Sequence, residues 1–127
     1  MKKLYFLLII AISFATRAQI VNIPDANFKA ELLSASASNY VASTETPTYL
    51  FINGSTVGQV SSYNTIDTNG DGEIQVSEAQ QIKYLKVGTV AINSLIGIEA
   101  FSNLQFLDCS QNSLVTLNIS SLTNLKY

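Results

Sequence analysis

The strongest constraint on the fold is an apolar pattern in the second half of the chain that recurs after 21 or 22 residues. The segment "AFSNLQF" at 100–106 recurs at a spacing of 21 as "SLTNLKY" at 121–127. Five apolar positions also recur at a spacing of 22: Ile82, Leu85, Val87, Ile92 and Leu95 are followed by Leu104, Leu107, Cys109, Leu114 and Leu117. This period is typical of stacked solenoids, whose units bury their apolar faces against one another. We therefore expect an α/β fold, a short solenoid of parallel strands over residues 82–127.

The repeated unit also predicts which side chains point inward. The segment "LQFLDCSQNSL" at 104–114 matches the pattern L-x-x-L-x-L-x-x-N-x-L of leucine-rich repeats, with Cys109 in the third leucine position. That position is interior, so we expect Cys109 to be a small buried hydrophobic residue without a catalytic role. Asn112 stands at the turn, where its amide can satisfy backbone groups, whereas Val90 takes this position in the preceding unit.

One aromatic residue per unit falls at an outward position of the expected strands. Tyr84, Phe106 and Tyr127 hold equivalent positions, and Lys86 and Asp108 lie beside them. Such a column could be a recognition surface, because aromatic residues anchor interfaces. It could equally be a ladder that stabilises neighbouring strands about 4.8 Å apart. Both interpretations stay open, and one column can serve both purposes.

The twelve residues "DTNGDGEIQVSE", at 67–78, carry four of the nine acidic side chains of the chain. Their spacing fits the calcium loop of the EF-hand, in which short oxygen-bearing side chains alternate and a glycine at the sixth position permits a sharp turn. Ile74, at the eighth position, is expected to pack into the core. The predicted calcium ligands are the side chains of Asp67, Asn69, Asp71 and Glu78, the backbone carbonyl of Glu73, and Gln75 acting through a water.

A solvated turn is the alternative interpretation of this stretch, because Asp, Asn and Gly are common in turns for reasons unrelated to metals. The match along the whole loop, and the mutual repulsion of its carboxylates without a cation, favour calcium. A large shell made only of oxygen atoms also suits calcium better than magnesium. Sensor proteins pair two such loops between helices, whereas this chain has one loop and no helix leading into it, so we expect a structural role.

The first eighteen residues have the order of a secretory signal peptide. Lys2 and Lys3 precede the apolar run 4–12, and small residues follow up to a cleavage position near Ala18. The run is too short for a membrane span, which takes about 20 residues. We therefore expect a secreted or outer-surface protein with three parts. These are a signal peptide at 1–18, an N-terminal cap at 19–81 that holds a helix within 23–38 and the loop at 67–78, and repeats at 82–127, the last one incomplete.

Composition excludes several classes of function. Removal of residues 1–18 takes away Lys2, Lys3 and Arg17 and no acidic residue, which changes the net charge from -2 to -5 and leaves no arginine. An acidic, arginine-free chain is a poor partner for nucleic acid. The absence of histidine excludes the usual catalytic triads and most zinc sites. One cysteine cannot form an internal disulfide. Small exported domains usually need an additional stabilising cross-link, and a bound metal ion is a candidate for it here.

The segments "IPDANFKAELL", "IDTNGDGEIQVSEA", "LIGIEAFSNLQFLDCSQNSL" and "LTNLKY" together carry a family resemblance. In these segments the chain resembles the N-terminal part of secreted, internalin-like leucine-rich repeat proteins of Bacteroidetes type. The resemblance implies that a helix and an EF-hand-like calcium loop cap a leucine-rich repeat solenoid. Longer members often end in a sorting domain, whereas this chain stops inside a repeat, so the resemblance implies a truncated product. Residues 39–63 lie outside the resemblance and read as a long loop with room for one hairpin.

These observations predict a secreted or cell-surface leucine-rich repeat binding module, stabilised by one calcium ion, that recognises an extracellular protein or a glycan and can serve adhesion. The alternative is a dockerin-like or accessory, non-catalytic module of a secreted hydrolase, because D-x-N-x-D-G-x-I also resembles dockerins, although those carry the loop twice. An enzyme acting through Glu73, Glu78 or Asp108 is disfavoured, since no separated acid pair in an apolar setting is recognisable. We therefore expect that the protein is not an enzyme.

Overall fold

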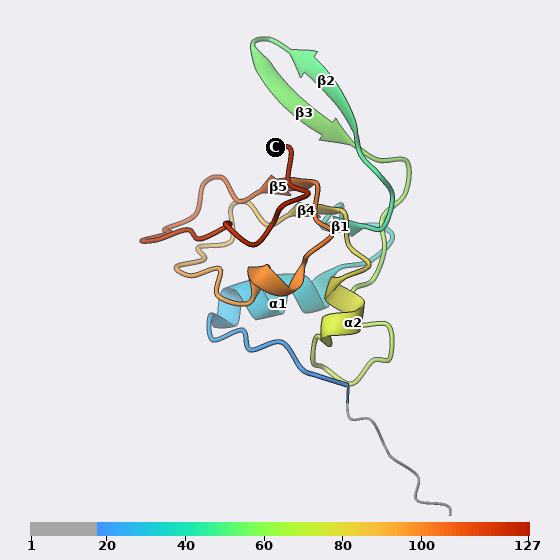
Figure 1. The fold of residues 1–127 in the computed structure, drawn as a ribbon, viewed down its shortest axis with the longest axis vertical. Coiled ribbons are helices and arrows are strands. Elements are labelled where there is room, and N and C mark those ends of the chain that lie inside the picture. Colours follow the sequence, from blue (N-terminus) through green and yellow to red (C-terminus); the bar gives the residue numbers. More distant parts are fainter. Residues whose placement is uncertain (1–17) are drawn as a thin grey trace, which may run out of the picture.

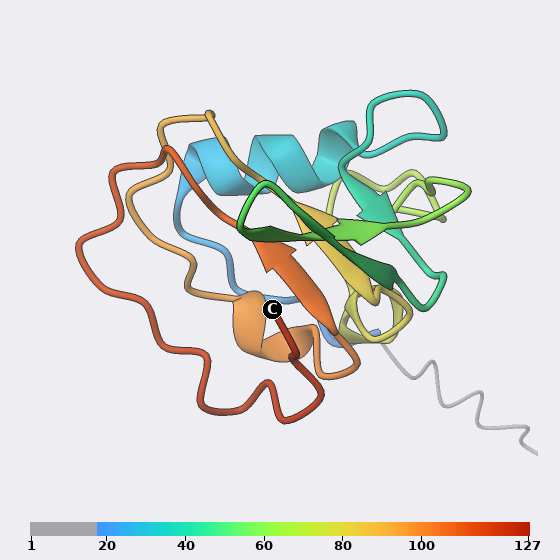
Figure 2. The same cartoon turned by 90° about the horizontal axis from the view of Figure 1, so that it is seen from above.

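The computed structural model describes residues 18–127, so nearly all of the predicted signal peptide lies outside the described residues. Within the described part, no helix is both long and apolar enough to cross a membrane. Figures 1 and 2 show a small mixed α/β body from which one hairpin projects. Its elements are α1 (Ala26–Ser34), β1 (Ala42–Ser43), β2 (Thr48–Ile52), β3 (Ser55–Gln59), α2 (Val76–Ala79), β4 (Tyr84–Lys86), the 3-10 helix η1 (Ile98–Ala100) and β5 (Phe106–Asp108).

Helix α1 follows from its cap and its spacing of apolar residues. Asp25 is the N-cap, and its Oδ1 accepts a hydrogen bond from the N–H of Phe28 at 3.0 Å. Phe28 and Leu32 lie four positions apart and are completely buried, so one face of the helix belongs to the core. The helix ends at Ser34, before the serine-rich end of the predicted 23–38 range, where Asn39 Nδ2 donates to the carbonyl of Ser34 at 2.6 Å.

The strands form two separate small sheets. The first has the order β1-β4-β5, with β1 antiparallel and β5 parallel to the central strand β4. The second is the antiparallel hairpin of β2 and β3, which rises from the body beside the chain end (Figure 1). Because β1 comes from the predicted cap and β4 and β5 from the predicted repeats, both parts of the chain share one sheet.

The prediction of a leucine-rich repeat solenoid is wrong. Across residues 18–127 no solenoid of parallel strands is present, since β4 and β5 form the single parallel pair and an antiparallel strand occupies the other edge of β4. The 22-residue period nevertheless sets the register of that pair, in which Tyr84 faces Phe106 and Lys86 faces Asp108. A stacked array becomes stable only through several successive neighbours. Here the first unit packs on α1 instead.

The two repeated units differ in how deeply their apolar residues are buried. All five apolar residues of the first unit are buried, in one cluster with Phe28 and Leu32 of α1. In the second unit Leu104 is buried, Leu107, Cys109 and Leu114 are partly buried, and Leu117 is exposed. The predicted role of Asn112 is confirmed. Its Nδ2 donates to the carbonyls of Val87 (2.7 Å) and Cys109 (3.0 Å), and its Oδ1 accepts from the N–H groups of Val90 and Ile92.

Candidate metal site

The loop at 67–78 is wound around the carboxylate of Asp67. Its Oδ1 accepts the N–H groups of Gly70 (2.8 Å) and Asp71 (3.2 Å), and its Oδ2 accepts that of Gly72 at 3.0 Å. Gly70 and Gly72 have φ of 71° and 78°, a left-handed backbone that glycine adopts without a steric cost. The alternation of Asp, Asn and Gly in the sequence therefore produces a tight turn with its polar side chains directed inward.

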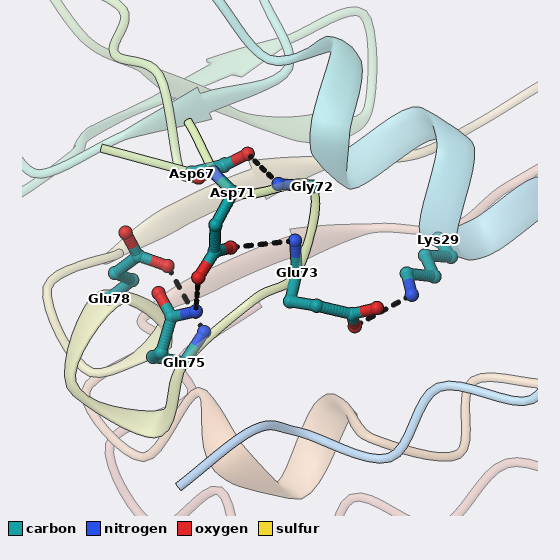
Figure 3. A network of polar contacts seen from close by, with 7 residues as sticks. All are labelled: Lys29, Asp67, Asp71, Gly72, Glu73, Gln75 and Glu78. Atoms are coloured by element: carbon teal, nitrogen blue, oxygen red, sulfur yellow. Dashed lines mark hydrogen bonds and ion pairs between the residues drawn. The ribbon is translucent and has the colours of Figure 1, made fainter. Parts of the chain in front are cut away.

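Three predicted ligand side chains meet at the centre of this turn. Asn69 Nδ2 lies 3.1 Å from Asp71 Oδ2 and 3.1 Å from Gln75 Oε1, and Gln75 Nε2 lies 2.8 Å from Asp71 Oδ2. Figure 3 shows the Asp71 and Gln75 side chains pointing toward each other, with Glu78 beside them. Residues that the sequence separates by up to six positions thus converge within hydrogen-bond distance.

Glu78 closes the loop from α2 and is buried. Its Oε1 accepts both the N–H and the hydroxyl of Thr68 at 2.8 Å, and its Oε2 accepts the N–H of Gln75 at 3.0 Å. The carboxylate therefore links the first and last thirds of the loop. Sequence reasoning did not identify Thr68 as a partner, because the second position of a calcium loop carries no recognisable signal.

Glu73 behaves differently from the other loop carboxylates. Its side chain turns away from the loop and its Oε2 lies 2.7 Å from Nζ of Lys29 on α1 (Figure 3). This orientation is compatible with a role for the Glu73 backbone carbonyl and not for its side chain. Since no other ion pair is found between residues 18 and 127, the carboxylates of Asp67, Asp71 and Glu78 have no cationic side chain as partner there.

Hydrogen bonds favour the ionised form of Asp71, which its ordinary pKa of 3.8 already makes the dominant form at neutral pH. The N–H of Glu73, followed by the side-chain amide of Gln75 and then that of Asn69, lowers the pKa of the Asp71 carboxyl below its ordinary value, although burial acts in the opposite direction. The centre of the loop therefore holds a full negative charge at neutral pH, and amide hydrogens supply the neighbouring positive ends of dipoles.

The residues fit calcium by the chemistry of their donor groups. In the described part of the chain, no three Cys, His, Asp or Glu side chains gather as a ready-made metal cluster. Three of the predicted ligands are carboxylates, those of Asp67, Asp71 and Glu78, and the structure does not bring these three together; the predicted ligands that it does bring together are Asp71, Asn69 and Gln75. All of them carry oxygen, the ligand atom of hard cations. Rotation of an Asn or Gln carboxamide about its last bond presents oxygen in place of nitrogen at nearly the same volume.

The far side of the loop is attached to the N-terminal segment, a contact that sequence reasoning missed. The N–H of Val21 donates to the carbonyl of Ile74 at 2.8 Å, and the N–H of Val76 donates to the carbonyl of Gln19 at 2.8 Å. Ile74 is completely buried, as predicted. A pairing of three residues gives no periodic signal in the sequence, so composition and pattern could not locate it.

No family model, curated protein or solved structure matches the chain. The assignment of a function therefore depends on the contacts of its own residues.

The predicted aromatic column is largely covered. The rings of Tyr84 and Phe106 are stacked, with centroids 4.9 Å apart and an interplanar angle of 6°, and both are buried. Tyr63 packs edge-on against Tyr84, and the backbone of Gly58 on β3 lies against Phe106. Burial, followed by Tyr63 and Asp108, raises the pKa of Tyr84 to about 12. This pair is thus a ladder between neighbouring strands.

The other residues of the predicted binding surface are accessible. Tyr127 is 53% exposed and packs against Tyr49 of β2, with ring centroids 4.7 Å apart. Lys86 is exposed, and Asp108 accepts the N–H and the hydroxyl of Ser110 at 3.0 and 2.6 Å. The half-buried Cys109 has a raised pKa, mainly from burial and then from the charge of Asp108, which favours the unreactive thiol.

Proposed function

We propose that this protein is an exported, non-catalytic binding module whose N-terminal half is stabilised by one calcium ion. The observation that carries the proposal is the meeting of Asn69, Asp71 and Gln75 at the centre of a loop in which, among residues 18–127, no cationic side chain pairs with the carboxylates of Asp67, Asp71 or Glu78. A bound divalent cation would offset the negative charge of these carboxylates, which no side chain among the described residues neutralises.

Each loop residue has a defined part in this proposal. Asp67, Asn69, Asp71, the carbonyl of Glu73 and the carboxylate of Glu78 would hold calcium directly, and Gln75 through a water. The ion would supply positive charge and tie the start of the loop to α2. At extracellular dissociation constants near 10⁻⁴ to 10⁻³ M, about 1 mM calcium adds roughly 0.4 to 1.4 kcal/mol of stability. This amount is useful in a domain whose second apolar unit is only partly buried.

The binding surface in this proposal includes the hairpin of β2 and β3. Leu50, Phe51 and Ile52 of β2 and Val57 of β3 are exposed, and Phe51 reaches 78%. Tyr127, which packs against Tyr49 of β2, adds an accessible aromatic group beside the hairpin, and Lys86 is an exposed basic group on β4. Exposed apolar groups of this kind suit an extracellular protein or glycan partner. Export is supported by the order of basic, apolar and small residues at 1–18.

The test is a calcium titration by calorimetry together with thermal melts in calcium and in chelator. We expect one saturable site and a melting temperature that rises with calcium. The double variant Asp67→Ala, Glu78→Ala should lose both effects. The double variant Glu31→Ala, Asp108→Ala has the same change of net charge outside the loop and should keep them. A parent protein that shows neither binding heat nor a shift would rule out the calcium function.

A further inference from the structure

We propose that residues 19–21 act as a positioning strand that holds the calcium loop in its binding conformation and thereby sets its calcium affinity. This inference rests on the proposed calcium function of residues 67–78. It concerns residues that are not themselves calcium ligands and that precede the loop by more than forty positions in the sequence.

The strand holds the part of the loop that leads into α2. The N–H of Val21 donates to the carbonyl of Ile74, and the N–H of Val76 donates to the carbonyl of Gln19, each at 2.8 Å. Gln75 lies between these two anchored backbone positions and is buried. The backbone of one predicted ligand is therefore fixed on both sides, and Glu78 follows it within the short helix α2.

The strand is itself fixed from its other side. Gly97 has a φ of 105°, and a Cβ on that residue would lie 3.2 Å from Cγ1 of Val21, 2.9 Å from the carbonyl oxygen of Asn22 and 2.8 Å from Cγ1 of Ile23. Val21 and Ile23 are buried in the main core. The strand therefore lies between the loop and the turn at Gly97, and its position is set by the body of the protein.

Calcium affinity depends on this arrangement through preorganisation. Without the Val21 and Gln19 contacts, the backbone at 74–76 would have to be ordered when calcium binds, and this ordering would weaken the binding. Loss of one backbone hydrogen bond of this kind corresponds to about a fivefold change in affinity. The coupling is reciprocal, so calcium binding must in turn stabilise the pairing of residues 19–21 with 74–76.

The experiment compares the parent with Val21→Pro, which removes the N–H that donates to Ile74, and with the control Ile20→Ser, which changes a half-exposed side chain and keeps the backbone contacts. Calorimetric titration with calcium chloride should give a dissociation constant about fivefold higher for Val21→Pro and within twofold of the parent for Ile20→Ser. A Val21→Pro protein that melts cooperatively without calcium and still binds like the parent would overturn the inference.

A second measurement on the unmodified protein covers the case in which Val21→Pro does not fold. Hydrogen exchange at the amides of Val21 and Val76 should slow by about fivefold or more when calcium is added, whereas the amide of Asn64, which bonds to Ala42 in the body, should change little. Equal exchange at Val76 with and without calcium would contradict the positioning role. A parent that binds no calcium in the titration would instead refute the underlying calcium function, so the two failures are distinct.

Discussion

Lys29 and Glu73 form an ion pair at 2.7 Å that joins helix α1 to the acidic loop across 44 positions of sequence. The pair directs the Glu73 side chain out of the loop and holds one positive charge beside the loop that carries the proposed cation site (Figure 3). Both side chains are about one-third exposed, so solvent weakens the attraction between them. Helix and loop are thus linked by charge as well as by packing.

Replacing Lys29 with Met should therefore strengthen calcium binding, by about twofold at low salt, because a nearby positive charge is removed. The stability of the calcium-free protein should fall by less than about 1 kcal/mol. Calorimetry at 20 mM and 500 mM potassium chloride would measure the effect, which should largely vanish at the higher concentration. Lys86→Met, which removes an exposed charge on β4, serves as the control. Weaker binding in Lys29→Met would contradict this electrostatic account.

Asp25 should make the stability depend on pH. Its carboxylate accepts the N–H groups of Phe28, Asn93 and Ser94, and these hydrogen bonds, that of Phe28 first, lower its pKa. A carboxyl with a lowered pKa in the folded protein stabilises it above the ordinary value of 3.8. That contribution disappears as the pH falls through the lower folded value.

The variant Asp25→Asn tests this dependence, since asparagine is also a good N-cap but does not titrate. We expect it to lower the free energy of unfolding by about 1 kcal/mol at pH 7. The difference from the parent should shrink as the pH is lowered from 5 toward 3. Urea unfolding at a series of pH values measures both quantities, and an equal difference at every pH would disagree with the assignment.

The absence of a side chain at Gly58 should be what allows the hairpin to pack against Phe106 of the aromatic ladder. A Cβ on Gly58 would fall 2.5 Å from the nearest ring carbon of Phe106. Gly58→Ala should therefore displace the hairpin or the ring and destabilise the protein by about 1 to 3 kcal/mol. Hydrogen exchange of the hairpin amides should accelerate. Thr56→Ala on the same strand is the matched control, and equal stability of both variants would show that the contact adapts freely.

Among the polar residues of the second repeated unit, Asn112 should be the one whose replacement destabilises the protein most. Four hydrogen bonds connect its side chain to Val87, Val90, Ile92 and Cys109. Asn112→Ala removes all of them and leaves partly buried backbone groups unpaired, so we expect a loss of about 2 kcal/mol in the free energy of unfolding. Urea denaturation with an unchanged m-value would establish this loss. Ser113→Ala, an exposed neighbour, should be neutral.

Local signals in the sequence were reliable wherever one residue dictates its own contacts. Asn112 at a turn and Gly72 at the sixth position of the acidic loop occupy the predicted places, and Asp25 caps the helix expected within 23–38. The apolar period predicted the register of β4 and β5 as well. The dipeptide Asn53–Gly54, with φ of 51° and 83°, is the hairpin signal that identifies the turn between β2 and β3.

The global arrangement could not be predicted in the same way. Periodicity reports a spacing between apolar residues but not which surface buries them, and here α1 covers the first unit while β1 occupies an edge of β4. Ala42 and Ser43 pair with β4 through their backbones, which any sequence can supply. The pairing of residues 19–21 with 74–76 is of the same kind.

The aromatic ladder gives the protein a built-in optical reporter. The chain has no tryptophan, so its near-ultraviolet signals arise from tyrosine and phenylalanine. Tyr40, Tyr63, Tyr84 and Phe106 follow one another at ring distances of 4.9 to 5.9 Å, close enough to share excitation energy. Since the pKa of Tyr84 is raised to about 12, its phenolate absorption will develop later in an alkaline titration than that of an ordinary tyrosine. Because Gly58 of β3 lies against Phe106, a displacement of the hairpin would change the surroundings of this ladder, and the near-ultraviolet signal of the unlabelled protein would report it.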